Sequence, residues 1–492
     1  MSTNSTMPLI ICLTSLLATI PILVFGRNKN LREFFTFLAA IITVGLVFSM
    51  VPTILDGKTI EYSLIELVPN VSLKFRVDGL GMIFAIVASV LWLITSIYVV
   101  GYMRGLKEHA QTRFFACFAL AISATMAVAF AANLLTLYIF YELLSLSTYP
   151  LVTHHQDKEA RGGGRKYLSY LMGTSIAFAL PAMIYIYMKT NETGLEFAGS
   201  GFLVDFVSRG EAKFLLLLLV FGFAKSGLMP FHSWLPGAMV APTPVSALLH
   251  AVAVVKVGVF CILRVFTGVF GIKFLQSMDL GTMIAWIAAF TVIVSSLIAL
   301  SQDNLKRRLA FSTIGQLAYI IMGVSLLSPK AVTGSMLHIA MHASGKITLF
   351  FCAGAIFVAT GKKYISEMKG IGKQMPITML CFFIGSMSII GLPFTGGFIS
   401  KFYLVSGAAQ AEQFPFLCVY LISSVLNVAY FFPIVFNAFF CKEEDSLFEN
   451  KINEAPVFCV LPLAITAFLS VGLFFCPDVI YDLTQVFLAM KG

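Results

Sequence analysis

Five ionisable side chains lie inside long apolar stretches of the sequence, far from the ends of those stretches: Glu142, Lys225, Lys256, Lys346 and Lys401. Each is placed where a membrane-spanning helix would hold it in the bilayer interior. A charge at the bilayer centre costs about 2.5–3.5 kcal/mol on insertion scales. Five of them therefore cost about 12–18 kcal/mol, which rivals the entire stability of an ordinary domain. Groups this costly are kept where they pair, meet water or carry an ion, so they indicate ion or proton transport.

Three titratable groups share one face of a predicted helix. His338, His342 and Lys346 are spaced by four residues, so they stack along one side of an apolar segment. Imidazole takes and gives protons near neutral pH, and the stripe therefore predicts a proton relay. Structural hydrogen bonding is one alternative. A metal site is another, although lysine is a poor ligand and no cysteine or carboxylate joins the stripe.

Glu142 and Lys225 are expected to form a buried ion pair, because pairing lets both stay charged in an apolar segment. Such a pair can act as a switch, since separating the two groups favours release of the lysine proton; a purely structural pair is the alternative. Lys256 lies near mid-span and can relay between Lys225 and Lys346, with snorkelling as the alternative. His250, six residues before Lys256, faces another side at membrane depth.

Two apolar stretches carry the same kind of interruption, a Gly-Leu and a Pro-Phe pair close to a lysine. Pro230 follows Lys225 in one, and Pro393 precedes Lys401 in the other. Proline removes a helical donor, so backbone groups are freed at membrane depth, which is tolerated only beside protein or water. Paired interrupted helices are typical of transporter sites built from repeats. Two helix ends flanking unrelated loops are the alternative.

The composition supports a membrane setting for all of these residues. Of the 492 residues, 59% are hydrophobic and 12% charged, with a mean hydropathy of +0.91, whereas about a quarter of a soluble protein is charged. The net charge of +9 sits in short loops between spans, so no nucleic-acid partner is expected. The nine cysteines are scattered singly, and the sequence has no phosphate-binding, dinucleotide or nucleophile-elbow motif. We expect no cofactor, metal or catalytic residue in this chain.

Apolar windows of about 20 residues, the length that crosses a bilayer, predict an all-α polytopic protein of about fourteen spans. The predicted spans start near Met7, Phe34, Leu80, Arg113, Leu134, Tyr167, Lys213, Pro244, Leu280, Arg308, Ala331, Pro376, Phe416 and Pro456. Basic residues gather in the odd-numbered loops, which places both termini outside. Residues 60–76 alternate like a small hairpin, residues 191–211 suggest a loop, and a short tail follows Cys476.

Several segments together resemble the antiporter-like subunits of respiratory complex I and of Mrp cation/proton antiporters. They are residues 221–236, 241–259 and 303–316, together with the His338/His342/Lys346 stripe, and the likeness spans about residues 75–440. Length and Lys401 make the chain look most similar to the Mrp D subunit, with membrane-bound hydrogenase subunits close behind. The run Lys225-Ser-Gly-Leu-Met-Pro departs from the commonest form of that broken helix.

The resemblance implies one transmembrane domain containing two inverted five-helix repeats, each with a broken helix. The expected divisions are residues 1–112 with three helices and the hairpin, 113–264 and 280–441 as the repeats, and 455–492 as the last helix and tail. It also implies a central polar axis that carries protons.

The implied function is that of a proton-translocating subunit of a multi-subunit membrane complex, foremost an Mrp-type Na⁺/H⁺ antiporter. The alternatives are the proton-pumping arm of a redox complex (NADH-quinone oxidoreductase or membrane-bound hydrogenase) and the coupling subunit of a carbon-uptake complex. Membership of an enzyme complex thus stays open. Expected partners are small hydrophobic subunits, protons and the lipid of a prokaryotic inner membrane, and passage of Na⁺ through this chain is left open.

Overall fold

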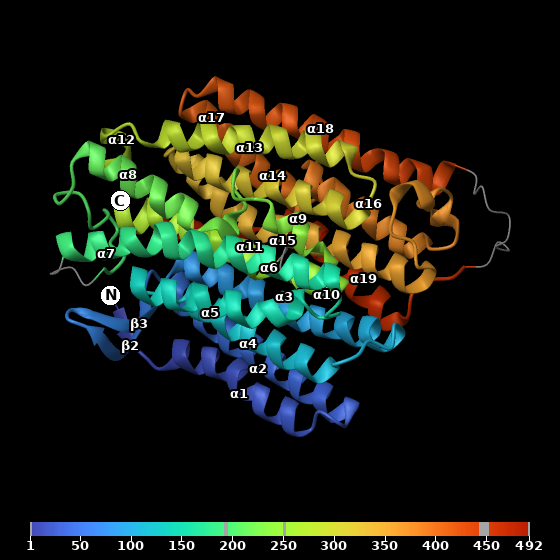
Figure 1. Ribbon diagram of the computed structural model, residues 1–492. Coiled ribbons are helices and arrows are strands. Elements are labelled where there is room, and N and C mark those ends of the chain that lie inside the picture. The colour runs from blue at the N-terminus through green and yellow to red at the C-terminus, as the bar shows by residue number, and fades with distance from the viewer. Residues whose placement is uncertain (1, 191–194, 249–251, 442–451, 491–492) are drawn as a thin grey trace.

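The computed structural model describes residues 2–190, 195–248, 252–441 and 452–490. Long helices run side by side along one direction, and both ends of the chain lie at the end of the bundle that carries the hairpin (Figure 1). In the described residues, ten helices are long and apolar enough to cross a membrane. The predicted all-α polytopic membrane fold is confirmed.

The helices before the first broken segment are α1 (Met7–Val24), α2 (Lys29–Leu55), α3 (Gly79–Gly105), α4 (Gln111–Ala129), α5 (Leu134–Val152), α6 (Lys158–Thr174) and α7 (Leu180–Lys189). The middle of the chain forms α8 (Arg209–Gly222), α9 (Trp234–Gly237), α10 (Thr243–Ala247), α11 (Val254–Arg264) and α12 (Ile272–Ser277). The remaining helices are α13 (Gly281–Ser301), α14 (Leu305–Ser325), α15 (Pro329–Thr360), α16 (Pro376–Ile390), α17 (Gly396–Gln410), α18 (Phe414–Phe440), α19 (Val457–Phe475) and α20 (Asp478–Ala489).

Polar caps fix where several of these helices begin. Asp78, Asn133 and Asp157 each accept a backbone hydrogen bond from the third residue that follows, at 2.9, 2.7 and 2.6 Å. Ser208 and Glu211 form a reciprocal capping box at the start of α8. Such caps satisfy N–H groups that lipid could not. The start of each of these helices is therefore determined by residues within three positions of it.

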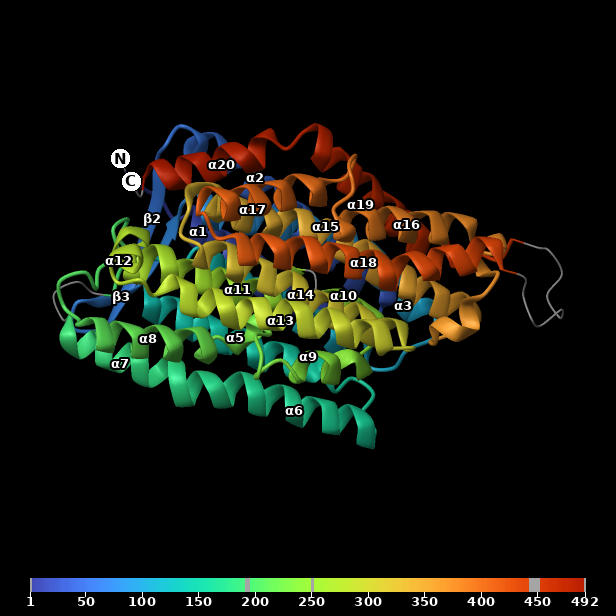
Figure 2. The ribbon, with the colours of Figure 1, turned by 90° about the horizontal axis from the view of Figure 1, so that it is seen from above.

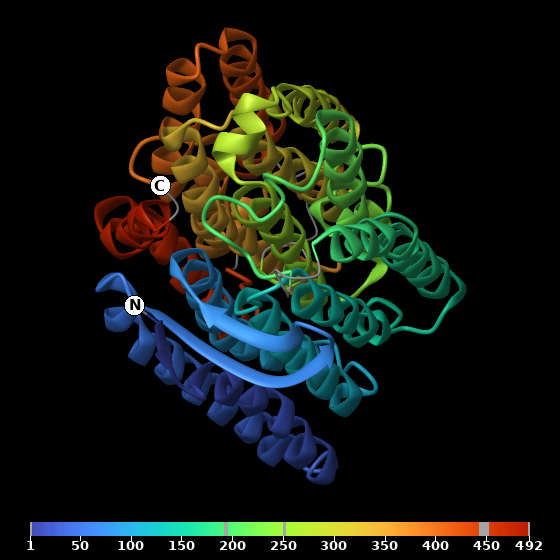
Figure 3. The same cartoon turned by 90° about the vertical axis from the view of Figure 1, so that its left-hand side faces the viewer.

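The predicted hairpin is confirmed. β2 (Thr59–Val68) and β3 (Val71–Val77) pair antiparallel around Asn70, whose φ is 61°, and β1 (Ser2–Asn4) adds a parallel strand that the sequence did not indicate. The strands lie across the ends of the N-terminal helices (Figure 3). Arg76 binds Glu61 and Glu196, each at 2.8 Å. Burial alone would raise the pKa of the Glu61 carboxyl, but Arg76 and Lys74 hold it below its usual range.

Both predicted interruptions are present. α8 ends at Gly222 and gives way to a 3₁₀ turn, Ala224–Ser226, that holds Lys225, and Pro230 follows in the connection to α9. α16 ends at Ile390, Pro393 lies in the gap, and α17 begins at Gly396 and carries Lys401. Both lysines are therefore attached to the broken segments. The division into repeats at residues 113–264 and 280–441 stays a prediction.

The long helix α15 forms the middle of the second half of the bundle. It packs against α3, α14, α16, α17 and α19, and it is buried from Ala331 to Ile356. α6 and α7 line up along one edge of the bundle, and α20 lies along the opposite edge (Figure 2). The tail predicted after Cys476 thus includes a helix, α20, that packs on α3 and α15.

Candidate functional site

Lys225 is fully buried between the broken segment and α5. Its Nζ donates to the Tyr141 carbonyl oxygen at 2.8 Å and to Ser145 Oγ at 2.6 Å, and it lies 3.1 Å from the centre of the Tyr141 ring. The Tyr141 hydroxyl in turn accepts the Lys225 backbone N–H at 3.2 Å. Among the described residues, both hydrogen-bond partners of this amine and the ring beneath it are uncharged. The amine is thus oriented by α5 but not neutralised by it.

The predicted direct ion pair between Glu142 and Lys225 is wrong for this structure. Among the described residues no Glu142 oxygen lies within 4.0 Å of a basic nitrogen, and both carboxylate oxygens are buried without a hydrogen-bond partner. The physical reason is helical geometry. Tyr141 and Ser145 are four apart and share the face that meets Lys225, whereas Glu142 is turned about 100° away. Glu142 can act on Lys225 only through space.

Lys256 meets the histidine stripe at its middle. Its Nζ lies 2.6 Å from His342 Nδ1, and both side chains are buried, one on α11 and one on α15. The His342 ring stacks on the His338 ring, with centroids 5.5 Å apart and planes inclined by 21°. The predicted relay position of Lys256 therefore connects to His342 rather than to Lys346. Lys256 of α11 and His342 and His338 of α15 therefore lie one after another in space.

His338 connects the histidine stripe to the second broken segment. Its Nδ1 lies 2.8 Å from Ser400 Oγ, and its Nε2 lies 3.1 Å from Gln316 Oε1. Lys401, the next residue on α17, donates to the Ile390 carbonyl oxygen at 3.0 Å. Its Nζ lies 4.8 Å from the centre of the Tyr319 ring, which also stacks on His338. A polar path thus runs from Lys256 through both histidines to the neighbourhood of Lys401.

Lys346 forms a side branch rather than the end of the stripe. Its Nζ donates to Ser312 Oγ at 2.8 Å, and the Tyr430 hydroxyl donates to the same oxygen at 2.9 Å. Tyr430 also contacts Asn427 on the same helix, α18. All of these side chains are buried. Lys346 is therefore held by Ser312 Oγ and the Leu309 carbonyl oxygen of α14, and Tyr430 of α18 supports that serine.

No hydrogen bond joins the first two lysines of the predicted path in the described residues. Lys225 and Lys256 make none with each other in the described residues, although the backbone of Gly258, two residues after Lys256, meets the turn that holds Lys225. A Cβ at Gly258 would lie 2.0 Å from the Ser226 nitrogen, so α11 presses directly against the turn that holds Lys225. His250, predicted to lie at membrane depth, falls outside the described residues. The broken segment and α11 are thus in backbone contact, whereas the Lys256 side chain points away from that contact, because residues two apart on a helix differ by about 200° in direction.

Several members of the path could not be found from the sequence. Gln316, Ser400 and Tyr319 contact the predicted groups, as do Ser145 and Ser312. Neutral polar residues are common in any span and carry no spacing signal of their own. Only the packing of α5, α14 and α17 around the lysines and histidines singles them out. Within the described part, these hydroxyl and amide groups make the hydrogen bonds that lipid could not.

Comparison with known proteins identifies relatives of two kinds. The chain is 32% identical over 410 residues to NADH-quinone oxidoreductase subunit N of Desulforudis audaxviator, covering 81% of this chain and 79% of the relative. It is 29% identical over 485 residues to the putative antiporter subunit mnhA2 of Staphylococcus haemolyticus, covering 92% of this chain but 59% of the relative. The chain therefore spans less than two thirds of the length of mnhA2. Placement in the Mrp D class stays a prediction.

Solved structures share the fold over nearly the full chain. A chain of the membrane-bound sulfane sulfur reductase, an archaeal respiratory membrane complex, superposes with a TM-score of 0.88 at 23% identity, covering 99% of this chain and 98% of that one. A chain of the Mrp complex from a Dietzia species gives 0.82 at 19% identity, covering 98% and 97%. Residues 131–427 match the family described as the transmembrane region of NADH:quinone oxidoreductase and Mrp antiporters. The chain belongs to this proton-antiporter family.

Proposed function

We propose that this chain is a proton-translocating subunit of a multi-subunit membrane complex that exchanges Na⁺ or another monovalent cation for protons. One observation carries the proposal. Lys256, His342 and His338 follow one another at contact distance inside an apolar bundle, and His338 then reaches Ser400 beside Lys401. Structural hydrogen bonding alone would not require two adjacent imidazoles and a lysine, each costly at membrane depth.

The proposed path begins at Lys225 and ends at Lys401. Glu142 tunes Lys225 through space, and Lys256, on the helix that packs against the Lys225 turn, receives the proton through a bridging water. His342 takes a proton at Nδ1 from Lys256 and gives one up at Nε2, a buried nitrogen with no hydrogen-bond partner among the described atoms. Passage to His338 then needs a ring rotation or a bridging water. Lys346 is a storage branch.

The setting we propose is a prokaryotic inner membrane with both termini outside. The sequence supports this orientation, because basic residues gather in the loops at the opposite end from the termini. Other membrane subunits are proposed as partners. Support comes from the solved structures with the same fold, whose titles describe membrane complexes. The cation could cross in this chain or in a neighbouring subunit.

Transport in inside-out vesicles tests the roles of the first two groups. Lys225→Ala and Glu142→Ala should each abolish cation-dependent proton movement, followed with a pH-sensitive dye, while the complex still assembles. Assembly is measured by native gel electrophoresis of the solubilised membranes. Transport at the wild-type level in both variants would refute the assignment. A loss of assembly in Glu142→Ala would instead make that carboxylate a structural group.

A second candidate is the proton-pumping arm of a redox complex. The relative named NADH-quinone oxidoreductase subunit N favours it, because this chain covers 79% of that relative but only 59% of mnhA2. The proton path would be the same and only the driving reaction would differ. Purification of the native complex decides between them. Accompanying flavin or iron–sulfur proteins would support the redox complex, and hydrophobic subunits alone would support the antiporter.

A further inference from the structure

Three histidines surround one carboxylate at the end of the bundle opposite the hairpin. Glu108 and His109 lie in the loop between α3 and α4, and His154 and His155 follow the end of α5. Glu108 Oε2 lies 3.6 Å from His154 Nε2 and 3.8 Å from both His109 Nδ1 and His155 Nδ1. Two loops distant in sequence thus direct three ring nitrogens at a single oxygen. The proton path described above uses none of these residues.

The tautomer of His109 is fixed by the backbone. Its Nε2 lies 3.0 Å from the His154 carbonyl oxygen, and because a carbonyl can only accept, Nε2 must carry the hydrogen. In the neutral ring, Nδ1 then presents a lone pair toward Glu108 Oε2. Metal-binding histidines commonly donate their other N–H to a backbone carbonyl in this way. Two facing lone pairs favour a cation between them.

His154 adds a second, independent observation. Its side chain is fully buried, and neither ring nitrogen has a hydrogen-bond partner among the described atoms. The ring stands edge-on to Phe114, with centroids 5.7 Å apart. The nearby guanidinium of Arg113 donates to the His154 carbonyl oxygen at 2.9 Å. Glu108 Oε2, 3.6 Å from Nε2, is close enough for an ion pair but too far for a hydrogen bond, and an ion bound between the two would remove the cost of this buried imidazole.

The spacing suits a tetrahedral ion that takes three ligands from the protein and keeps its fourth position open. Bonds of about 2.0–2.2 Å in a tetrahedron place ligand atoms about 3.3–3.6 Å apart. The three distances to Glu108 Oε2, 3.6–3.8 Å, need a contraction of only a few tenths of an ångström. The ligand atoms of Glu108, His109 and His154 lie within 4.8 Å of one another, and His155 is not a member of that group. Metal binding would therefore draw the two histidines together by up to roughly 1 Å. Nitrogen-rich donors select zinc-like ions over magnesium or calcium.

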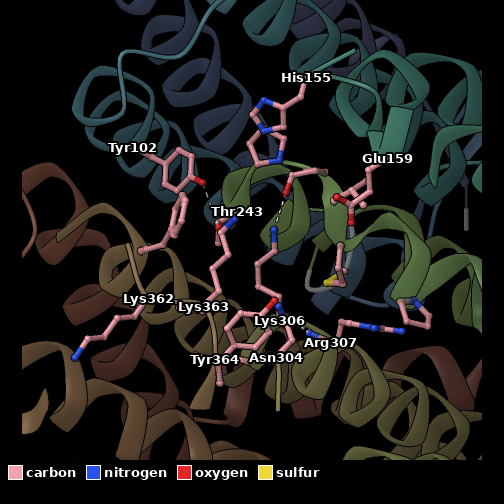
Figure 4. A pocket seen from close by; sticks show the side chains of 18 of the residues that line it. Tyr102, His155, Glu159, Thr243, Asn304, Lys306, Arg307, Lys362, Lys363 and Tyr364 are labelled. Carbon is pink, nitrogen blue, oxygen red and sulfur yellow. Dashed lines mark hydrogen bonds between the residues drawn. The ribbon is translucent and has the colours of Figure 1, made fainter. Parts of the chain in front are cut away.

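We propose that Glu108, His109 and His154 bind one divalent transition-metal ion of the zinc type, with His155 next to the site. The ion would join the α3–α4 loop to the end of α5. Glu108, His109 and His155 also line a cavity of about 930 Å³, with Lys306 and Lys362 among the residues on its other side (Figure 4). An ion held here would sit at the wall of that cavity. The inference is independent of the proposed transport function.

Metal binding to the full chain, purified with its accompanying subunits and stripped with a chelator, tests the site. Titration calorimetry with Zn²⁺ alone should show a tight site in the wild type. His109→Gln and His154→Gln should each weaken that site by at least roughly tenfold, the smallest effect expected even for a lost second-shell partner. Co²⁺ alone should give the intense visible absorption of a tetrahedral ion in the wild type and not in the variants.

Glu159→Gln is the matched control, because Glu159 lines the same cavity and is not part of the cluster. It should bind Zn²⁺ like the wild type. The His109 side chain is 53% exposed, so His109→Gln should fold even if a variant of buried His154 does not. Equal binding by the wild type and His109→Gln, or no tight site in the wild type, would overturn the proposal. Because binding is measured directly, the result does not depend on transport.

Discussion

Replacing Gly258 with alanine should disable transport without changing any ionisable group. α11 contacts the Lys225 turn at this glycine, and an added Cβ would lie 2.0 Å from the Ser226 nitrogen and 2.2 Å from the Lys225 carbonyl carbon. Real Cβ atoms essentially never approach closer than 3.0 Å and ordinary contact begins at 3.4 Å, so the turn and α11 must separate by about 1.0 to 1.4 Å. Both atoms belong to backbone, and no side chain can rotate away to absorb the change.

The displacement is large compared with the hydrogen bonds of Lys225. Its Nζ lies 2.8 Å from the Tyr141 carbonyl oxygen, and a movement of 1.4 Å along that line would stretch the contact to 4.2 Å. Losing one hydrogen bond to a charged group costs about 1.5–3 kcal/mol. That corresponds to about a 10- to 100-fold fall in the population of correctly placed amine, since each tenfold is about 1.4 kcal/mol. Overpacking adds about 1–3 kcal/mol of instability.

Initial rates of dye-monitored proton movement in inside-out vesicles, normalised to the amount of assembled complex, measure the effect. Gly258→Ala should lose at least about tenfold in rate. Gly173→Ala on α6 is the matched control, because nothing lies within 4 Å of its added Cβ. That variant should transport normally and be slightly more stable, since alanine favours a helix over glycine by about 1 kcal/mol. Equal rates in both variants would refute the contact argument.

Three further outcomes are expected. Lys256→Met should abolish transport, because the histidine stripe loses its 2.6 Å contact with α11, while thermal stability stays near the wild-type value. Arg264→Met should lower the stability of the solubilised protein by about 3–5 kcal/mol, since Asp78, 2.7 Å from that guanidinium, stays buried. Glu61→Gln should remove part of the acid sensitivity of unfolding. Arg76 holds the pKa of the Glu61 carboxyl below its ordinary value of 4.5, so the charged carboxylate stabilises the fold at pH values above 4.5. That contribution is lost as the pH falls through the lowered pKa.

Each of these outcomes has a control within the chain. Lys158→Met removes an exposed lysine and should leave transport unchanged; if it matched Lys256→Met, the loss would be a general effect of charge. For the buried pair, the double variant Asp78→Asn with Arg264→Met should recover part of the lost stability, and additive losses would contradict the ion-pair argument. Unfolding curves of Glu61→Gln that matched the wild type from neutral pH to about pH 4 would exclude the carboxylate as the acid-sensitive group.

Local sequence determined the helices, the interruptions and the histidine stripe. A long apolar run predicts a spanning helix from the residues of that run alone. Pro230 and Pro393 each break a helix because proline in a helix interior removes a backbone donor. The spacing of four between His338 and His342 is likewise a property of a single helix, α15. The hairpin followed from alternation on either side of Asn70. Each of these predictions depended on residues within about one turn or one strand pair.

Contacts between segments were decided only by tertiary packing. The sequence suggested that Glu142 pairs with Lys225, but the face of α5 that meets the broken segment carries Tyr141 and Ser145. Which lysine meets which histidine depends on how α11 crosses α15, and the Glu108 cluster depends on two loops more than 40 residues apart. Neither the Lys256–His342 contact nor the Glu108 cluster is indicated by a repeated spacing of residues in the sequence. Residue spacing sets the direction of a side chain about its own helix, and only the packing of helices decides what that side chain meets.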